Sequence, residues 1–289
     1  MPIKESELIL NPDGSIYHLN LKPEHIANTV IFVGDQDRVA KVSRHFDTIE
    51  FETQKREFKT HTGTYKGKRI TVISTGIGPD NIDIVMTELD ALVNIDFETR
   101  TIKKNLTSLD IIRIGTSGSL QKNIPVDSFL LSTYGLDVNA MLHAYQIDTI
   151  CNKAIENAFI DATNWDSKKG RPIVIKNSSN LERKFESNKT HKGITITAGG
   201  FYGPQGRVLR LPLQDPLLNK KIDSFSYQGE RITNLEMETS AIYGLSKLLG
   251  HQALSLNAII ANRATGNFSS DPKQTVENLI TYTLNKIAD

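Results

Sequence analysis

Two glutamates that bracket a methionine, Glu236-Met237-Glu238, combine residue types and a spacing that could do chemistry. Asn234-Leu235 before them and residues 239–245 after them are too apolar for a solvated loop, so the pattern predicts a turn from a strand into a helix. A carboxylate is rarely buried without a partner, because removing its charge from water costs several kcal/mol. Two glutamates in such a place favour a ligand rich in hydroxyl donors, such as a sugar.

Arg113 is an arginine whose surroundings predict burial, because it lies in the apolar run Ile111-Ile112-Arg113-Ile114-Gly115. A buried arginine needs an anion. The residues directly after it, Gly115-Thr116-Ser117-Gly118, offer backbone amides and hydroxyl groups. The alternative is that Arg113 bridges two structural carboxylates, and the sequence leaves both interpretations open.

Two further arginines could join it at an anion site. Arg38 lies one helical turn after Gly34-Asp35, where an apolar run ends, and Arg56 precedes Glu57-Phe58. Taken alone, each fits an ordinary surface charge. Together with Arg113 they would suit a phosphate dianion, because the guanidinium fork matches its oxygens. Several donors are needed, because one close ion pair gives only about 4 kcal/mol at an effective dielectric of about 20.

Short β-branched runs alternate with segments of helical period along the chain, which predicts an α/β fold with a mostly parallel sheet covered on both faces. Such sheets bind ligands at the carboxyl ends of their strands, where several of these motifs fall. The polar segment from about residue 166 to 192 is interpreted as a surface excursion and not a linker, so residues 1–289 are expected to form one domain. The expected strands are 29–33, 69–74, 110–115, 194–197 and 253–260, with helices that run to about residues 46 and 93 and a last helix after Pro272.

Composition excludes several classes of function. The 289 residues carry 34 Lys and Arg against 33 Asp and Glu, a formal charge of +1, which argues against a nucleic-acid surface. The lone Cys151 excludes an intrachain disulfide and a cysteine-rich metal site. No apolar stretch approaches a membrane span and no secretory signal is evident, so a cytoplasmic protein is expected. Gly76-Ile77-Gly78 lacks the third glycine of a dinucleotide fingerprint, which disfavours a nucleotide cofactor.

Five motifs in order along the chain resemble those of the nucleoside phosphorylase-I family. The resemblance covers about residue 17 to the C-terminus, and it implies a single-domain three-layer α/β/α sandwich with a mixed, mostly parallel central sheet. It also implies phosphate-dependent cleavage of an N-glycosidic bond, with inorganic phosphate as a co-substrate and no cofactor. The motifs are Gly34-Asp35 with Arg38, Arg56-Glu57-Phe58, Ser74-Thr75-Gly76-Ile77-Gly78, Arg113-Ile114-Gly115-Thr116 and Glu236-Met237-Glu238.

The resemblance implies roles for individual residues and a homodimer as the minimal active unit, with a hexamer left open. Arg56 and His18 would act in the neighbouring subunit's site, on phosphate and on the ribose 5′-hydroxyl. No essential metal is implied, although Glu57, Ile70 and Ser74 match an interface site for a monovalent cation in some members. Phosphate would be held by Gly34, Arg38, Arg56, Arg113 and Thr116, and ribose by His18, Thr116, Glu236, Met237 and Glu238.

The segment from Phe201 to Arg207 resembles the part of uridine-cleaving members that binds the pyrimidine. Gln205 carries both a donor and an acceptor for the ring, and Arg207 could stabilise the negative charge on a leaving uracil. Phe201 would stack on the ring, with Ile260 and Arg263 supporting it. The implied catalytic residues are Arg113, Gln205, Arg207 and Glu238.

The resemblance therefore implies cleavage of uridine to uracil and ribose 1-phosphate. A purine nucleoside phosphorylase is the alternative, but purine-cleaving members place an aspartate near Arg263, and here the next one is Asp271. A hydrolase would not need three arginines, and a non-catalytic nucleoside-binding protein would not need an intact phosphate site. Two stretches depart from the uridine-cleaving pattern: Gly203-Pro204, whose order is reversed, and Tyr134–Gln146, interpreted as a surface loop.

Overall fold

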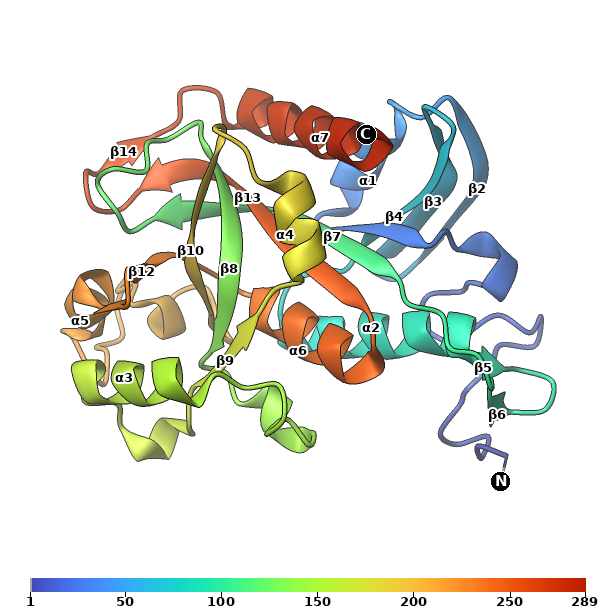
Figure 1. Ribbon diagram of the computed structural model, residues 1–289, viewed down its shortest axis with the longest axis horizontal. Helices are drawn as coiled ribbons and strands as arrows, with labels where there is room; N and C mark the ends of the chain where they lie inside the picture. The colour runs from blue at the N-terminus through green and yellow to red at the C-terminus, as the bar shows by residue number, and fades with distance from the viewer. Residues whose placement is uncertain (1) are drawn as a thin grey trace.

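The computed structural model describes residues 2–289, and its strands and helices follow one another along the chain as the hydrophobic pattern suggests (Figure 1). The strands are β1 (Thr29–Val33), β2 (Thr48–Lys55), β3 (Phe58–Tyr65), β4 (Lys68–Ser74), β5 (Ile95–Asp96), β6 (Thr101–Ile102), β7 (Asp110–Ser119), β8 (Phe129–Asp137), β9 (Ile173–Lys176), β10 (Thr190–Thr197), β11 (Ser226–Tyr227), β12 (Glu230–Glu236), β13 (Gln252–Asn262) and β14 (Asn267–Phe268). The helices are α1 (Gln36–Ser43), α2 (Pro79–Asn94), α3 (Lys153–Thr163), α4 (Ser179–Phe185), α5 (Leu218–Ser224), α6 (Thr239–Leu249) and α7 (Pro272–Ala288).

The side chains of β1 show how the sheet separates two cores. Val30 and Phe32 pack into the core beneath α2 and α6, whereas Ile31 and Val33 pack into the core beneath α1 and α7. Successive side chains of a strand point to opposite faces, so a strand that is apolar throughout must be covered on both sides. Figure 1 shows α1 and α7 above the sheet and α2 and α6 below it. The expected three-layer α/β/α fold is confirmed.

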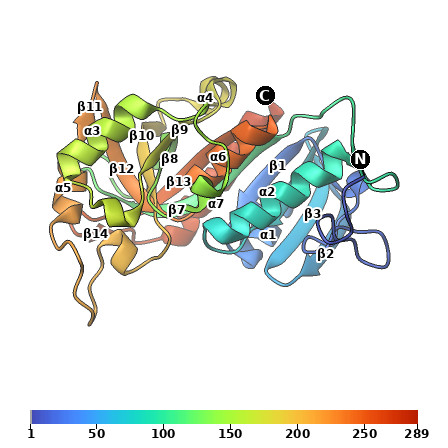
Figure 2. The same ribbon diagram turned by 90° about the horizontal axis from the view of Figure 1, so that it is seen from below.

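The sheet is mixed, and part of it closes on itself. Parallel pairings join β4, β1, β7 and β13 in one run and β8, β10 and β12 in another. Antiparallel pairings of β8 with β13 and of β7 with β12 connect the two runs. The pairings β12–β10–β8–β13–β7–β12 therefore form a closed ring of five strands, and the first half of β7 also pairs with β1. Figure 2 shows the strands of the ring at one end of the molecule and β1, β2 and β3 at the other.

Most of the expected elements are confirmed, but one segment is not a surface excursion. Within residues 166–192 the structure has strand β9, which pairs with β8, and helix α4, whose Leu181 and Phe185 are buried. Charged residues surround these short apolar runs and conceal them in the sequence. The stretch Tyr134–Gln146 is likewise not all loop, because its first residues complete β8. Within residues 2–289, no helix combines the length and the apolar character needed to cross a bilayer.

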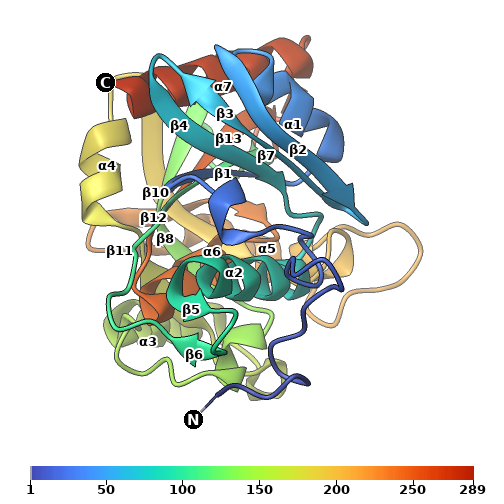
Figure 3. The same cartoon turned by 90° about the vertical axis from the view of Figure 1, so that its right-hand side faces the viewer.

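The segment between β10 and α5 exposes large apolar side chains. It contains a short 3-10 helix, Gly203–Gln205, and Figure 3 shows the chain after this helix projecting from the body of the molecule. Val208, Leu209 and Leu211 are 57%, 80% and 74% exposed. The base of this projection carries Phe201, Gln205 and Arg207, so the projection adjoins the predicted base-binding residues.

Candidate active site

The carboxyl ends of β1, β4, β7, β12 and β13 surround a cavity of about 1040 Å³. The parallel strands β4, β1, β7 and β13 finish at the same edge of the sheet, and β12, which is antiparallel to β7, brings its carboxyl end beside Gly118. Most of the predicted site residues line this cavity: Gly34, Arg38, Arg113, Thr116, Phe201, Gln205, Arg207, Glu236, Met237, Glu238, Ile260 and Arg263.

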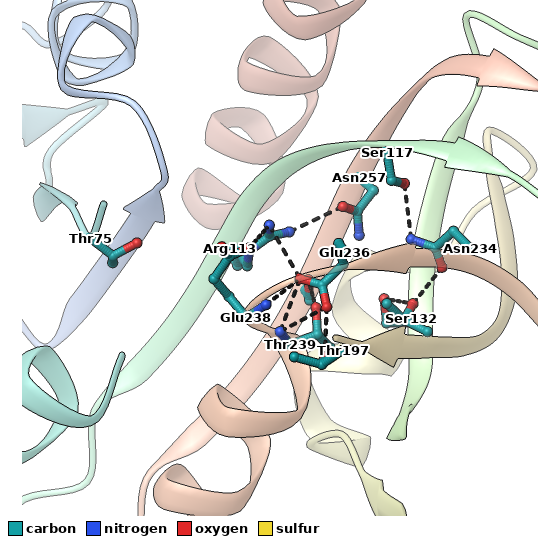
Figure 4. A network of polar contacts seen from close by, with 12 residues as sticks. Thr75, Arg113, Ser117, Ser132, Thr197, Asn234, Glu236, Glu238, Thr239 and Asn257 are labelled. Carbon is teal, nitrogen blue, oxygen red and sulfur yellow. Dashed lines mark hydrogen bonds and ion pairs between the residues drawn. The ribbon is translucent and has the colours of Figure 1, made fainter. Parts of the chain in front are cut away.

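Arg113 lies at the buried floor of the cavity and is only 7% exposed. Its Nη2 donates to Oε2 of Glu238 at 2.5 Å and lies 3.2 Å from Oε2 of Glu236, and its Nη1 donates to Oδ1 of Asn257 at 3.1 Å (Figure 4). Burial alone would lower the pKa of Arg113, but the two carboxylates outweigh burial and raise it. Arg113 thus bridges two carboxylates, which is the alternative that the sequence left open. These contacts do not use all five guanidinium N–H groups, so it can still donate to an anion.

The position of Arg113 depends on Gly115. The two residues lie on the same face of β7, since side chains alternate along a strand. A Cβ atom on Gly115 would come within 2.5 Å of the guanidinium carbon of Arg113, closer than real Cβ contacts allow. A glycine at this position therefore gives the arginine room to fold back over the strand toward the glutamates.

Glu236 fastens the start of helix α6. Its carboxylate accepts hydrogen bonds from the backbone amides of Glu238 and Thr239 and from the hydroxyl of Thr197. The first amides of a helix lack partners within the helix, so a carboxylate here satisfies them and complements the helix dipole. Burial raises the pKa of Glu236, with Arg113 opposing the rise and Glu238 adding to it. Protein donors already surround both of its oxygens, and its predicted contact with ribose stays a prediction.

Glu238 links strand β7 to the start of helix α2 through its two carboxylate oxygens. One of its oxygens is paired with Arg113, and the other accepts the backbone N–H of Gly78 at 2.9 Å. Gly78 begins α2 with φ of +104°, a conformation that favours glycine. The carboxylate is only 5% exposed, but it lines the cavity beside Met237. It is therefore held at a fixed place next to the arginine.

Arg38 brings a second guanidinium toward Arg113. Its Nη1 donates to the carbonyl of Ile114 at 3.2 Å, which draws the side chain across from α1 to β7. Burial lowers the pKa of Arg38, and the charge of Arg113 lowers it further. Two cations that repel each other in a partly buried cavity are stabilised by an anion between them. Gly34 and Thr116 line the cavity at the same end.

The other end of the cavity holds a second cationic group. Arg207 donates to Oε1 of Gln205 at 2.5 Å, and its guanidinium carbon lies 3.9 Å from the centre of the Phe201 ring. Arg263 donates two hydrogen bonds to the backbone carbonyl of Gln205, each at 3.2 Å. Burial lowers the pKa of Arg207, with the nearby charge of Arg263 adding to the effect. Gln205 is 2% exposed and is held from both sides.

Two predicted residues lie away from the cavity of their own chain. His18 pairs through Nδ1 with Glu88 at 2.6 Å, and Arg56 is exposed in the turn between β2 and β3, with φ of +55°. Neither lines the cavity. Their predicted roles require a second copy of the chain and stay predictions.

Two of the predicted cation-site residues, Glu57 and Ser74, are in contact within one chain, and the third, Ile70, lies apart from them. Ile70 is buried in the core beneath α1 and α7, and four residues further along β4 Ser74 donates to the carbonyl of Glu57 at 2.5 Å. Residues so spaced on a strand are about 13 Å apart. Among residues 2–289, no group of three or more His, Cys, Asp or Glu side chains is arranged to hold a metal ion.

Sequence reasoning missed several polar residues that shape the site. Asn257 lies within the apolar run of β13 and orients Arg113, while Thr197 ends β10 and holds Glu236. Asn257 could have been identified from the sequence, because a polar side chain inside a buried strand requires a hydrogen-bond partner. Ile77, just before α2, and Asn81, in the first turn of α2, also line the cavity. Thr197 gave no signal of its own, because threonine is common in strands.

Comparison with known proteins agrees with this architecture. Residues 28–287 match the model of the phosphorylase superfamily. A uridine phosphorylase from Thermococcus kodakarensis is 29% identical over 265 residues, covering 89% of this chain and 80% of the relative. A DeoD-type purine nucleoside phosphorylase from Shewanella is 26% identical over 274 residues, 92% of this chain and 96% of the relative. A solved Trypanosoma brucei nucleoside phosphorylase, described as showing uridine phosphorylase activity, superposes with a TM-score of 0.87 at 29% identity, covering 97% of this chain and 99% of that one.

This chain belongs to the phosphorylase superfamily. The resemblance to nucleoside phosphorylases that its motifs indicated is confirmed, and the family's reaction uses phosphate as co-substrate.

Proposed function

We propose that this protein is a uridine phosphorylase, which cleaves uridine with inorganic phosphate to give uracil and ribose 1-phosphate. The observation that carries the proposal is that two cationic groups, one at each end, line a single cavity, and that Glu238 lines the same cavity bonded to Arg113. Arg38 and Arg113 suit a phosphate dianion, and Gln205, Arg207 and Arg263 suit a uracil ring that leaves as an anion. The similar uridine phosphorylase from Thermococcus kodakarensis, and the Trypanosoma brucei nucleoside phosphorylase described as showing uridine phosphorylase activity, add support.

Phosphate would bind against the backbone of Gly34, the hydroxyl of Thr116 and the guanidinium groups of Arg38 and Arg113. The ribose would lie against Met237, with Glu238 accepting hydrogen bonds from its 2′- and 3′-hydroxyls. Because Glu238 and Arg113 are bonded at 2.5 Å, a sugar on the first and a phosphate on the second are adjacent. Holding two reactants in contact removes much of the entropic part of the barrier.

Bond cleavage would proceed through a sugar with oxocarbenium character, and phosphate, not a protein side chain, would attack the anomeric carbon. The glycosidic electron pair moves onto uracil as phosphate approaches the opposite face. Arg207 would exchange its bond with Oε1 of Gln205 for one to a ring carbonyl, and the freed amide would pair with N3–H and the neighbouring carbonyl. Preorganised donors of this kind stabilise charge that develops in the transition state.

A pyrimidine is favoured because, among residues 2–289, the aspartates that line the main cavity are Asp35 and Asp37, beside Arg38 and not at the base end. Asp223 acts on the charge of Arg263 but lies outside the lining. Asp271 caps α7 by accepting the amide of Gln274 at 3.0 Å and does not line the main cavity. The DeoD-type relatives make purine cleavage the competing function.

A panel assay tests the proposal directly. Release of free base from uridine, thymidine, inosine and adenosine would be measured with and without phosphate. We expect phosphate-dependent release of uracil to be the fastest. Faster release of hypoxanthine or adenine would assign the chain to purine cleavage, and release without phosphate would indicate a hydrolase. Binding of uridine with no release under any condition would indicate a non-catalytic binding protein.

A further inference from the structure

A second cavity of about 540 Å³ adjoins the phosphate end of the main cavity. It lies between α1 and α7, which cover the same face of the sheet (Figure 1) and are joined where Arg44 and His45 bond Glu277. Arg38, Thr116 and Ile260 line both cavities. The two spaces therefore share a wall that contains two of the proposed phosphate ligands.

The charges around the second cavity leave an excess of cations. Glu277 accepts Arg44 at 2.5 Å and His45 at 2.7 Å, so its carboxylate is already matched. Lys41 and Lys273 also line the space, and neither forms an ion pair within residues 2–289. With Arg38 they face the single remaining carboxylate, that of Asp271.

The second cavity reaches the phosphate end without involving the base end. Phe201, Gln205 and Arg207 line only the main cavity. The exposed members of the main lining include Ile77, Phe201 and Phe268, whereas Arg113 and Glu238 are buried. A nucleoside that enters past Phe201 and Phe268 would stand between this opening and the phosphate ligands. The other exposed part of the lining carries the carboxylates of Asp35 and Asp37, which repel an anion.

We propose that the second cavity is an entry site for inorganic phosphate, which it captures at Lys41 and Lys273 and passes to Arg38 and Thr116 while nucleoside occupies the main cavity. The inference rests on the proposed phosphorolysis, because it assigns a route to the same phosphate ligands. Cationic walls raise the local concentration of an anion and its rate of association, and dissolved salt screens the effect. The two lysines thus act on the arrival of phosphate and not on the bond-breaking step.

The test is the double variant Lys41→Gln/Lys273→Gln, assayed with phosphate and uridine varied independently. We expect the KM for phosphate to rise about three- to tenfold at low ionic strength, and the rise to fade as KCl approaches about 0.5 M. The KM for uridine and kcat should stay within about twofold of wild type. The matched control is Lys104→Gln/Lys189→Gln, which removes the same charge from exposed positions away from both cavities.

A second variant tests the route by blocking it. Gln274→Trp places an indole at the lining of the second cavity without changing charge. With wild type, phosphate should bind at the same rate to the free enzyme and to enzyme saturated with an uncleavable uridine analogue. In the blocked variant, the analogue should slow phosphate binding by about tenfold or more.

The outcomes separate this inference from the proposed function. Wild-type protein without phosphate-dependent cleavage would overturn the proposed function. Active wild type with a phosphate KM unchanged in the double variant relative to the control would overturn the entry site alone. A parallel rise in the KM for uridine would also overturn it, because the lysines would then act on nucleoside binding.

Discussion

At the scale of single residues, Arg113 and Glu238 form an ion pair with each other in the absence of any ligand. Their contact is buried, where a charge that loses its partner costs several kcal/mol. The pair therefore has a structural role as well as the proposed catalytic one, and substitutions must be chosen to separate the two.

Replacing Glu238 with glutamine tests the ribose contact. An amide keeps the size and one oxygen, but it accepts hydrogen bonds from sugar hydroxyls more weakly than a carboxylate. We expect kcat/KM for uridine to fall by about tenfold to a hundredfold, and that for 2′-deoxyuridine to fall less, because the latter lacks one of the hydroxyls. Equal losses on the two substrates would place the effect on Arg113 instead.

Asp137 should make stability depend on pH. Its Oδ1 accepts the amide of Asn139 and the hydroxyl of Ser240, while Oδ2 is buried without a partner in the described chain. Burial raises the pKa of Asp137 from 3.8 to about 6, so between these values the folded state binds more protons than the unfolded state. Stability contributed by the protonated acid is therefore lost as pH rises through this window.

The variant Asp137→Asn does not titrate and should lack this loss. Relative to wild type, we expect it to gain about 2 to 3 kcal/mol between about pH 4 and pH 7, as measured by urea unfolding. Asp96→Asn is a control of opposite sign, because hydrogen bonds from Thr99 lower the pKa of Asp96. A constant difference between Asp137→Asn and wild type across this range would contradict the assignment.

At the scale of elements, the site is built by strand ends and the glycines that follow or interrupt them. Sequence patterns located β1, β4, β7, β13 and the turn at Glu236-Met237-Glu238, because buried parallel strands are continuous apolar runs. From these, the convergence of Arg38, Arg113 and Glu238 could be predicted. The direct bond between Arg113 and Glu238 could not, because side-chain direction depends on the tertiary neighbours Asn257 and Gly78.

The base end was less predictable than the phosphate end. Gln205 and Arg207 were recognised from their segment, but not their mutual bond, which requires the loop's actual conformation. The short strand β9 and helix α4 were missed because polar residues flank runs too short to show a period.

Gly115→Ala tests how strand geometry positions the arginine. The new methyl group would overlap the guanidinium of Arg113 and force it away from Glu238. We expect the KM for phosphate to rise and kcat to fall, together by about a hundredfold in kcat/KM, as for loss of a transition-state donor. Thermal unfolding checks that the fold is retained.

Gly118→Ala is the matched control on the same strand. Its added Cβ would meet Ala261 and Arg263 at 3.5 Å, an ordinary contact, and lies toward the base end. Its phosphate KM should resemble that of wild type. If Gly115→Ala behaves like this control, Arg113 is not held by the space above Gly115.

At the scale of the whole molecule, Arg56 and His18 require a second subunit if they act at all. In a two-fold dimer, each site would take Arg113 from one chain and Arg56 from the other. Arg56→Ala and Arg113→Ala should each be nearly inactive. After mixing and subunit exchange, about a quarter of wild-type activity should return, because half of the dimers would carry one intact site of two.

A mixture that stays inactive, although subunit exchange is verified by mass-tagged chains, would show that Arg56 does not cross between subunits. Full activity of Arg56→Ala alone would exclude it from the phosphate site altogether. Arg56 is exposed and does not line the cavity of its own chain, so a role at the phosphate site requires it to act in a partner subunit.

Strand β7 pairs with strands at both ends of the sheet, and this affects the cooperativity of unfolding. Because β7 pairs with β13 along one edge, and with β1 at residues 110–114 and then β12 at Gly118 and Ser119 along the other, a single strand belongs to both ends of the sheet and joins them. Calorimetry should show one melting transition, and amide protons of residues 111–114 should be among the slowest to exchange with deuterium. An early melting step confined to either end would show that β7 does not make the two ends of the sheet unfold as one cooperative unit.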